Sequence, residues 1–164
     1  MKDAWDRFEA VVTQMQPGLL EKLGHPVSEA EIKDAESRLG FSLPHDYANL
    51  LRIHNGQLQR AHFLFGRHEF LSLARAMSEW SIWNDLLEEG DFDDRSPKSE
   101  VGIQPVWWSQ GWLPFAGNGG GDFLCLDMAP SVEGQSGQVI EIFHDAPERT
   151  LVAKNFRDWF IGLA

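Results

Sequence analysis

Four polar residues in the second half of the sequence have the side-chain types that acid–base catalysis or metal binding requires. They are Asp122, Asp127, His144 and Asp145. A histidine beside carboxylates can exchange protons near neutral pH, and the same groups can ligate a metal ion. The sequence contains neither Gly-x-Ser-x-Gly, which would fix a nucleophile, nor the zinc motif His-Glu-x-x-His. We therefore expect no catalytic residue, metal or cofactor, and keep a metal- or ligand-dependent enzyme using Asp122 and His144 as an alternative.

A structural role explains the same residues more simply. Asp122 and Asp145 flank predicted strand ends, where carboxylates commonly accept hydrogen bonds from turn amides. The single cysteine, Cys125, lies among leucines with no base nearby, so we expect a buried and unreactive thiol. One cysteine permits no disulfide within the chain, which agrees with a reducing compartment, and we expect a cytoplasmic protein.

Strands on either side of a glycine-rich turn must position these side chains. Residues 112–116 and 123–126 are apolar at consecutive positions, which is typical of strands covered on both faces. The five residues 117–121 read Gly-Asn-Gly-Gly-Gly, and both residue types accept the positive φ angles of a tight hairpin. No lysine or helix follows the glycines, so the turn is not a phosphate-binding loop. Residues 137–145 form a third β-rich run.

Helices are predicted before and after this sheet. Ser28 and Glu31 form a capping box that begins a helix over residues 29–39, and Gly40 ends it. A further helix begins at Pro44, runs to His54 and is closed by Asn55-Gly56. The other expected elements are helices over 3–15, 72–88 and 155–163, a short turn at 19–24 and a strand at 62–65. The sequence therefore predicts an α+β fold: a single domain whose central, antiparallel-rich mixed sheet packs against several helices.

The charge of the chain restricts the class of partner. Fourteen Lys and Arg against 25 Asp and Glu give a net charge of −11 over 164 residues. Direct nucleic-acid binding is not expected, because phosphates require a basic surface. We define the acidic segment as residues 85–100, where seven acidic and two basic side chains give a net charge of −5. A protein with a basic surface would be attracted to it. We expect no membrane association, because no apolar run approaches spanning length.

Candidate partner-binding residues lie in the acidic segment and shortly after it. A solubilising loop is the ordinary explanation for such charges, and core filling is the ordinary explanation for tryptophan. Trp107 and Trp108 are adjacent, and neighbours on a strand point to opposite faces, so we expect one to be less buried and to anchor an interface. The candidates are Glu88, Glu89, Asp91, Asp93, Asp94, Trp107 and Trp108. The spacing of Asp91, Asp93 and Asp94 does not match a calcium-binding loop.

Two groups of short motifs follow one another along the chain. The first comprises Leu43-Pro44, Tyr47 and Asn55-Gly56, after an acidic helix that ends in Leu39-Gly40. The second comprises Leu113-Pro114-Phe115-Ala116, Gly120-Gly121-Asp122, Leu124-Cys125-Leu126-Asp127, and Gly137-Gln138-Val139 through His144-Asp145. In this order they resemble the SUKH superfamily, named for the yeast Smi and Knr cell-wall regulators. The resemblance covers about residues 28–160 of the 164-residue domain, and we expect these motif residues to be structural.

The resemblance implies a Smi/Knr-like fold and a non-catalytic binding function. Many bacterial members of the superfamily are immunity proteins that neutralise toxins, often nucleases, by direct binding. Fungal members are instead scaffolds for cell-wall synthesis. A compact acidic domain favours the immunity role, with a basic toxin domain as the partner. A general interaction or scaffold module related to the fungal regulators is the alternative.

Overall fold

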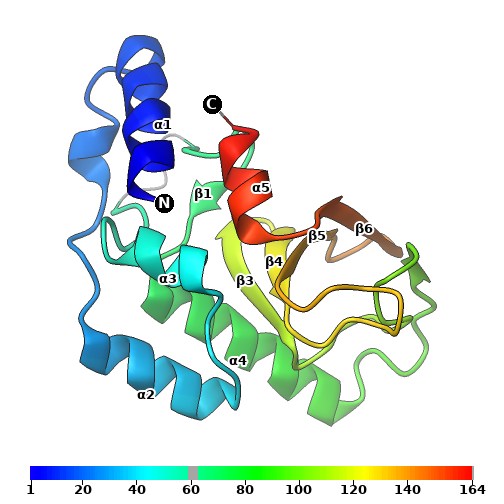
Figure 1. The fold of residues 1–164 in the computed structure, drawn as a ribbon. Helices are drawn as coiled ribbons and strands as arrows, with labels where there is room; N and C mark the ends of the chain where they lie inside the picture. The colour runs from blue at the N-terminus through cyan, green and yellow to red at the C-terminus, as the bar shows by residue number, and fades with distance from the viewer. Residues whose placement is uncertain (59–62, 164) are drawn as a thin grey trace.

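The computed structural model describes residues 1–58 and 63–163, which form a six-stranded sheet with helices on both faces (Figure 1). The helices are α1 (Lys2–Met15), the 3₁₀ turn η1 (Leu20–Lys22), α2 (Glu29–Leu39), α3 (His45–Leu51), α4 (Leu73–Glu89) and α5 (Phe156–Ile161). The strands are β1 (Glu69–Phe70), β2 (Lys98–Ser99), β3 (Trp112–Gly117), β4 (Phe123–Asp127), β5 (Gln138–Ile142) and β6 (Glu148–Ala153). Their order in the sheet is β1-β3-β4-β5-β6-β2. Only the pairing of β2 with β6 is parallel, so the expected α+β class with an antiparallel-rich mixed sheet is confirmed.

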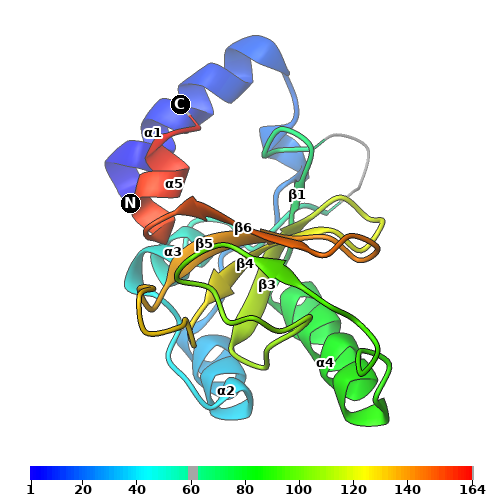
Figure 2. The same ribbon diagram turned by 90° about the vertical axis from the view of Figure 1, so that its right-hand side faces the viewer.

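The sheet lies between two helical layers. Figure 2 shows α4 and α2 on one side of it and α5 and α1 on the other. On the α5 side, the Phe115 ring lies 4.8 Å from the Trp159 ring, measured between centroids. On the α4 side, the Trp83 ring lies 5.1 Å from that of Trp108. Every residue of β3 and β4 is therefore buried, as their continuous apolar runs predicted.

The glycine-rich turn joins β3 and β4 as an antiparallel hairpin, as predicted. Asn118 fixes it from within, because its Oδ1 accepts hydrogen bonds from the amides of Gly120 (2.8 Å) and Asp122 (3.2 Å). Pro114 lies inside β3, where a proline cannot donate a ladder hydrogen bond. The register shifts between Pro114 and Ala116, so a β-bulge accommodates the proline.

Local signals also predicted most helices correctly. The amide of Ser28 donates to Glu31 Oε2 and the amide of Glu31 donates to Ser28 Oγ, so the capping box of α2 is present. Gly40 ends α2 with a φ of 78°. Helices α1, α4 and α5 begin and end within two residues of their predicted bounds. No helix in the described part of the chain is both long enough and apolar enough to cross a membrane.

The elements differ from the expectations in three places. Helix α3 ends at Leu51, not at His54: the Ile53 amide donates to the Leu50 carbonyl in a tighter turn (2.9 Å). Asn55 does not close α3, since its Oδ1 accepts the Leu73 amide at the start of α4 (2.7 Å). The predicted strand at 62–65 begins outside the described residues, and Phe65 forms only an isolated bridge with His68. Strands β1, β2 and β6 were not predicted.

Candidate functional site

The sheet does not bring the four candidate catalytic residues together. Asp122 and His144 meet at the hairpin end of β4, whereas Asp127 lies at the other end of that strand, about 17 Å of extended chain from Asp122. Asp122 Oδ1 accepts hydrogen bonds from the His144 amide (3.1 Å) and lies 2.9 Å from His144 Nδ1. This carboxylate therefore ties the hairpin to the segment that follows β5.

The atoms of Asp122, His144 and Asp145 are close enough to ligate one cation, since one ligand atom from each lies within 4.8 Å of the others. His144 Nε2 is 3.8 Å from Asp145 Oδ2. The geometry favours an ion pair over a metal centre, because Asp122 Oδ1 already contacts two nitrogens of His144 and Asp122 Oδ2 accepts from Asn118 Nδ2 (2.7 Å). A metal ion would have to displace those hydrogen bonds.

The Asp122–His144 pair should make stability depend on pH. Burial opposes ionisation of Asp122, but hydrogen bonds from His144 prevail and lower its pKa; the same hydrogen bond raises the pKa of His144. The lowered Asp122 pKa gives stability that is present above pH 3.8 and lost as the pH falls. The raised His144 pKa gives stability that is fully present below pH 6.5 and lost as the pH rises through the folded-state value.

We therefore expect His144→Gln to destabilise the protein most between about pH 4 and pH 6.5, and less on either side of that window. Because His144 is half-exposed, the loss should be at most about 1 kcal/mol. Urea unfolding of both proteins from pH 3 to pH 9 measures it. His25→Gln, at another exposed histidine, is the control. A pH-independent difference would show that His144 contributes packing rather than charge.

Asp127 and Cys125 are core residues of β4. Asp127 is fully buried and accepts hydrogen bonds from Gln138 Nε2 (2.8 Å) and from the Ala129 amide (3.1 Å). Burial raises the pKa of Asp127 despite these hydrogen bonds. Cys125 is also fully buried, and burial raises the pKa of its thiol well above the ordinary value, so the thiol stays protonated and is a poor nucleophile.

Trp107 and Trp108 lie in the connection between β2 and β3 and are both buried. The expectation that they occupy a strand and that one is more exposed is therefore wrong. Trp107 is held by Arg149: its carbonyl oxygen accepts from Arg149 Nε (3.0 Å) and Nη2 (2.8 Å), and its ring lies 4.4 Å from the guanidinium carbon. Trp108 Nε1 donates to Asn84 Oδ1 (2.7 Å). Neither tryptophan is exposed at the surface of the chain.

The acidic segment presents its carboxylates at the end of α4. Gly90 ends the helix with a φ of 83°. Phe92 anchors the following turn, because its half-buried ring stacks on Trp83 at 5.5 Å between centroids. The acidic side chains around it are exposed, and they are Glu88, Glu89, Asp91, Asp93 and Asp94.

The motif residues occupy the core, caps and turns. Tyr47 is fully buried against Phe115, and Pro44 is the N-cap of α3. Leu43 is buried and its amide donates to Glu36 Oε1 (2.8 Å). Pro114 lies in β3, Asn55 contacts the start of α4, and Gly120 and Gly121 lie in the hairpin turn. Gly56 packs directly against the backbone of Ser72.

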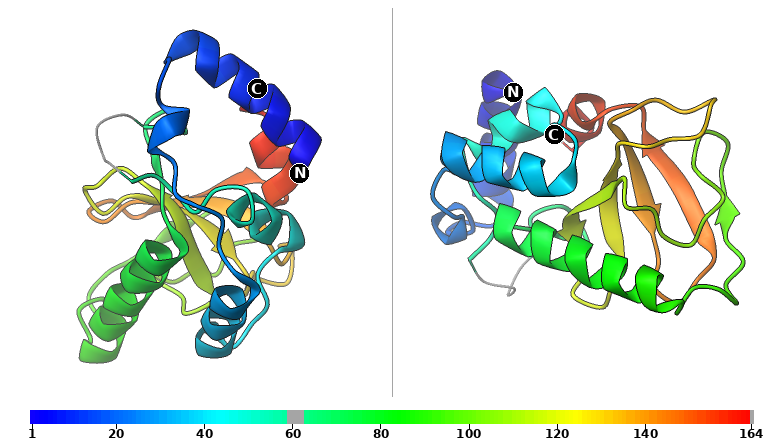
Figure 3. Two further views of the ribbon diagram at one scale, coloured as in Figure 1. Left: turned by 90° about the vertical axis from the view of Figure 1, so that its left-hand side faces the viewer. Right: turned by 90° about the horizontal axis from the view of Figure 1, so that it is seen from below.

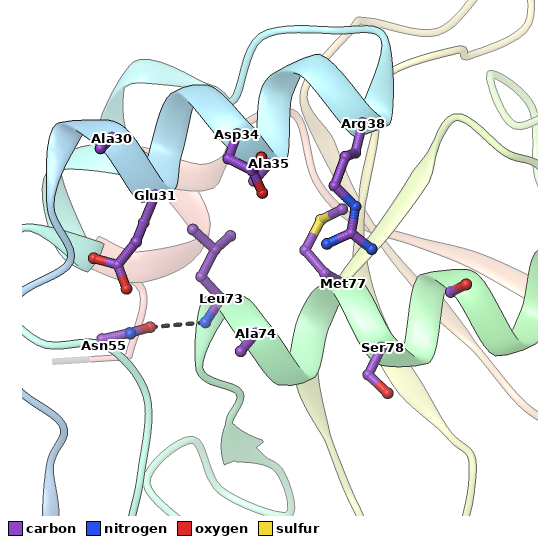
Figure 4. A pocket seen from close by; sticks show the side chains of 11 residues that line it. Ala30, Glu31, Asp34, Ala35, Arg38, Asn55, Leu73, Ala74, Met77 and Ser78 are labelled. Atoms are coloured by element: carbon purple, nitrogen blue, oxygen red, sulfur yellow. Dashed lines mark hydrogen bonds between the residues drawn. The ribbon is translucent and has the colours of Figure 1, made fainter.

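A groove between α2 and α4 is the feature that the sequence did not reveal. It has a volume of about 650 Å³ and is open to solvent (Figure 4). Buried Ala35, Leu73 and Met77 contribute its apolar floor. Charged side chains of α2 stand along one wall, and small side chains of α4 form the other; the charged residues are Glu31, Asp34 and Arg38, and the small ones are Ala74, Ser78 and Ser81. About 40 residues separate the two walls in sequence, so no local motif marks the groove.

Comparison with known proteins finds a matching family model and relatives in fungi. The model of the SMI1 / KNR4 family (SUKH-1) matches residues 26–162. The chain is 25% identical over 179 residues to the "Cell wall biosynthesis/cell cycle regulator smi1" of Schizosaccharomyces pombe, covering 100% of this chain and 35% of that protein. It is 19% identical over 197 residues to the "Cell wall assembly regulator SMI1" of Saccharomyces cerevisiae, covering 98% and 39%.

A third relative is "KNR4/SMI1 homolog 2" of Debaryomyces hansenii, which is 24% identical over 199 residues. The match covers 96% of this chain and 34% of that protein. The chain thus spans little more than a third of the length of these relatives. The family model extends across most of the sequence, from the loop before α2 to the end of α5. The resemblance drawn from the motifs is confirmed, and the chain belongs to the SMI1/KNR4 family (SUKH-1).

Proposed function

We propose that the chain is a non-catalytic interaction module that binds a partner protein. The observation that carries this proposal is the open groove between α2 and α4, which has an apolar floor and charged rims. Partly apolar concave surfaces of this kind are typical of protein recognition. By contrast, the polar residues that resembled a catalytic site, such as Asp122 and Asp127, are engaged in structural hydrogen bonds.

The relatives support a regulatory role for this module. Two of them are named as regulators of cell-wall biosynthesis or assembly, and neither name describes catalysis. We therefore give the interaction or scaffold module, which was the alternative drawn from the sequence, precedence over toxin immunity. We extend to this chain, as part of the proposal, a cytoplasmic location and a role in a regulatory assembly that serves cell-wall synthesis. Its net charge of −11 supports a protein partner rather than a nucleic acid.

The test is to identify and reconstitute a complex. The tagged chain is used to capture partners from cells at low and at high salt, and each captured protein is then purified and titrated by calorimetry. We expect a direct one-to-one complex. We also expect the double variant Asp122→Asn, His144→Ala to bind equally well once its folding is confirmed by circular dichroism. The proposal fails if no purified candidate binds directly, or if this double variant abolishes a measurable catalytic activity.

The exposed acidic segment favours a narrower second candidate, which is neutralisation of a basic toxin domain. Its carboxylates would face a cationic surface that normally contacts phosphate. If so, replacing Asp91, Asp93 and Asp94 together with asparagine should weaken binding to the basic partner at least about tenfold and reduce the salt dependence of the affinity. Calorimetry at several salt concentrations measures both effects.

The control for that variant removes three exposed charges elsewhere, through Asp3→Asn, Glu21→Gln and Glu133→Gln. Both triple variants have the same net charge, so only a local role of the acidic segment separates them. Equal affinities for the two would remove the acidic segment from the interface.

A further inference from the structure

The two helices that form the groove run side by side and in the same direction (Figure 3). Glu31 of α2 and Leu73 of α4 lie at the end where both helices begin, and Arg38 and Ser81 lie toward the other end. Figure 4 shows the Leu73 and Met77 side chains extending into the space between the helices. Methionine is flexible and adapts to different apolar partners, so this floor can accept side chains of varied shape.

The α4 wall changes character along its length. Ala74, Ser78 and Ser81 follow one another at intervals of four and three residues, which places them on one face of the helix. The same interval continues to Asp85 and Glu88, both of which are exposed. The groove therefore leads directly onto the acidic segment. The small side chains would let the backbone of a partner approach α4 closely. The carboxylates of Asp85 and Glu88 come next along the same face of the helix.

The α2 wall is also mainly acidic. Glu31 and Asp34 stand opposite α4, and Arg38 is the one basic residue in the groove lining. Glu31 is held in place by the capping box, where its Oε2 accepts from the Ser28 amide (2.8 Å) and from Ser28 Oγ (2.6 Å). These hydrogen bonds lower the pKa of Glu31, so it carries its charge at neutral pH. Two carboxylates and one guanidinium therefore line the groove, and the carboxylates of Asp85 and Glu88 follow beyond the lining on the same face of α4.

We propose that this groove binds an amphipathic helix of a partner protein, with apolar residues on one face and lysine or arginine on its flanks. The apolar face would pack on Ala35, Leu73 and Met77. The basic flanks would face Glu31 and Asp34 within the groove, and Asp85 and Glu88 where α4 continues beyond it. Two helices that leave a groove between them offer ridges on which a third helix packs, and the small residues of α4 suit an interaxial distance of about 8–10 Å. Helix-in-groove recognition with charge complementarity sets both fit and orientation. This inference rests on the proposed protein-binding function and names the chemistry of the partner.

Two synthetic helical peptides of equal length test the charge and the site. Both carry leucine at helical spacing, and they differ only in having lysine or glutamate at the flanking positions. In nuclear magnetic resonance titrations of the ¹⁵N-labelled chain, we expect the lysine peptide to shift the amide signals of α2 and α4. We expect the glutamate peptide to bind at least about tenfold more weakly. Equal binding of the two peptides, or shifts confined to other elements, would overturn the proposal.

A pair of serine variants tests the groove itself. Ser78 is exposed on the α4 wall, so Ser78→Trp should fill the groove without disturbing the core, and we expect at least a tenfold loss of affinity for the lysine peptide. Ser37→Trp makes the same change at an exposed residue of α2 outside the groove lining and should bind as the wild type does. If a native partner binds both variants equally well, the interaction function stands and the groove is not its site.

Discussion

Replacing Arg149 with methionine should lower the free energy of unfolding by about 3–5 kcal/mol, the largest loss that we expect from a single side chain outside the hydrophobic core. Arg149 is fully buried, and every hydrogen bond found for it in the described residues ends on a backbone carbonyl. Its Nη1 donates to the carbonyl oxygens of Ala146 (2.8 Å) and Glu148 (2.9 Å), and its Nε and Nη2 donate to that of Trp107. Burial lowers the pKa of Arg149 to about 10, so the guanidinium stays charged at neutral pH.

Replacing a buried charge by an apolar group of similar volume is often harmless when its partner is removed as well. Here the partners are carbonyl groups that no side-chain change can remove. Methionine would leave the Trp107 carbonyl buried without a donor, at a cost of about 1–3 kcal/mol, and would also remove the donors to the part-buried carbonyls of Ala146 and Glu148. Arg149→Lys should be intermediate, because an ammonium group cannot reproduce the planar fork of the guanidinium.

Urea unfolding, followed by tryptophan fluorescence, measures the loss. Arg157→Met is the matched control, because Arg157 is exposed and its Nη1 lies 3.6 Å from Asp46 Oδ1. This variant should lower the free energy of unfolding by less than about 1 kcal/mol. If the free energy of unfolding of Arg149→Met lies within about 1 kcal/mol of the wild-type value, the hydrogen bonds of Arg149 do not hold the connection between β2 and β3 in place.

Replacing Gly56 with alanine should destabilise the fold by about 3 kcal/mol or more. Gly56 has a φ of 73°, a region that disfavours residues with a Cβ atom. The added Cβ would lie 2.2 Å from the Ser72 nitrogen and 2.5 Å from the Ser72 Cα. Both are backbone atoms, so no side-chain rotation relieves the clash.

The clash also falls where α4 begins, next to the Asn55 side chain that caps the Leu73 amide. Hydrogen exchange should therefore show faster opening of the first turn of α4, in addition to a lower midpoint of urea unfolding. Gly40→Ala is the control: its φ is 78°, but nothing lies within 4 Å of the added Cβ, so only the conformational cost of about 1 kcal/mol is expected. If Gly56→Ala and Gly40→Ala lower the free energy of unfolding equally, the Ser72 backbone moves to accommodate the added Cβ atom and the clash is not costly.

Local chemistry explains which elements were predictable from the sequence. The capping box of Ser28 and Glu31 determines where α2 begins whatever the helix packs on, and the glycine-rich turn determines the β3–β4 hairpin. The missed β6 has no comparable signal, because its buried position is occupied by a charged residue, Arg149. Strands β1 and β2 contain two residues each and exist only through their pairing with β3 and β6.

The candidate site was less predictable because it depends on contacts between distant residues. Trp107 looked like an interface residue, yet its burial depends on Arg149, which lies 42 positions later. Asp122 and His144 lie together because they flank the neighbouring strands β4 and β5. The groove arises only when α2 and α4 lie on the same face of the sheet. The residue spacing within either helix alone does not predict that arrangement.

The shortness of the two outermost strands has a consequence for behaviour at high concentration. Strands with free backbone donors and acceptors at the margin of a sheet recruit other chains, which leads to fibres and strand-exchanged dimers. Within the described residues, this sheet ends on one side at Glu69–Phe70 and on the other at Lys98–Ser99. Two residues offer too few hydrogen bonds to hold a foreign strand. The four interior strands are thus flanked by edge strands that are too short to pair stably with another chain, and we expect the protein to resist edge-to-edge association at high concentration.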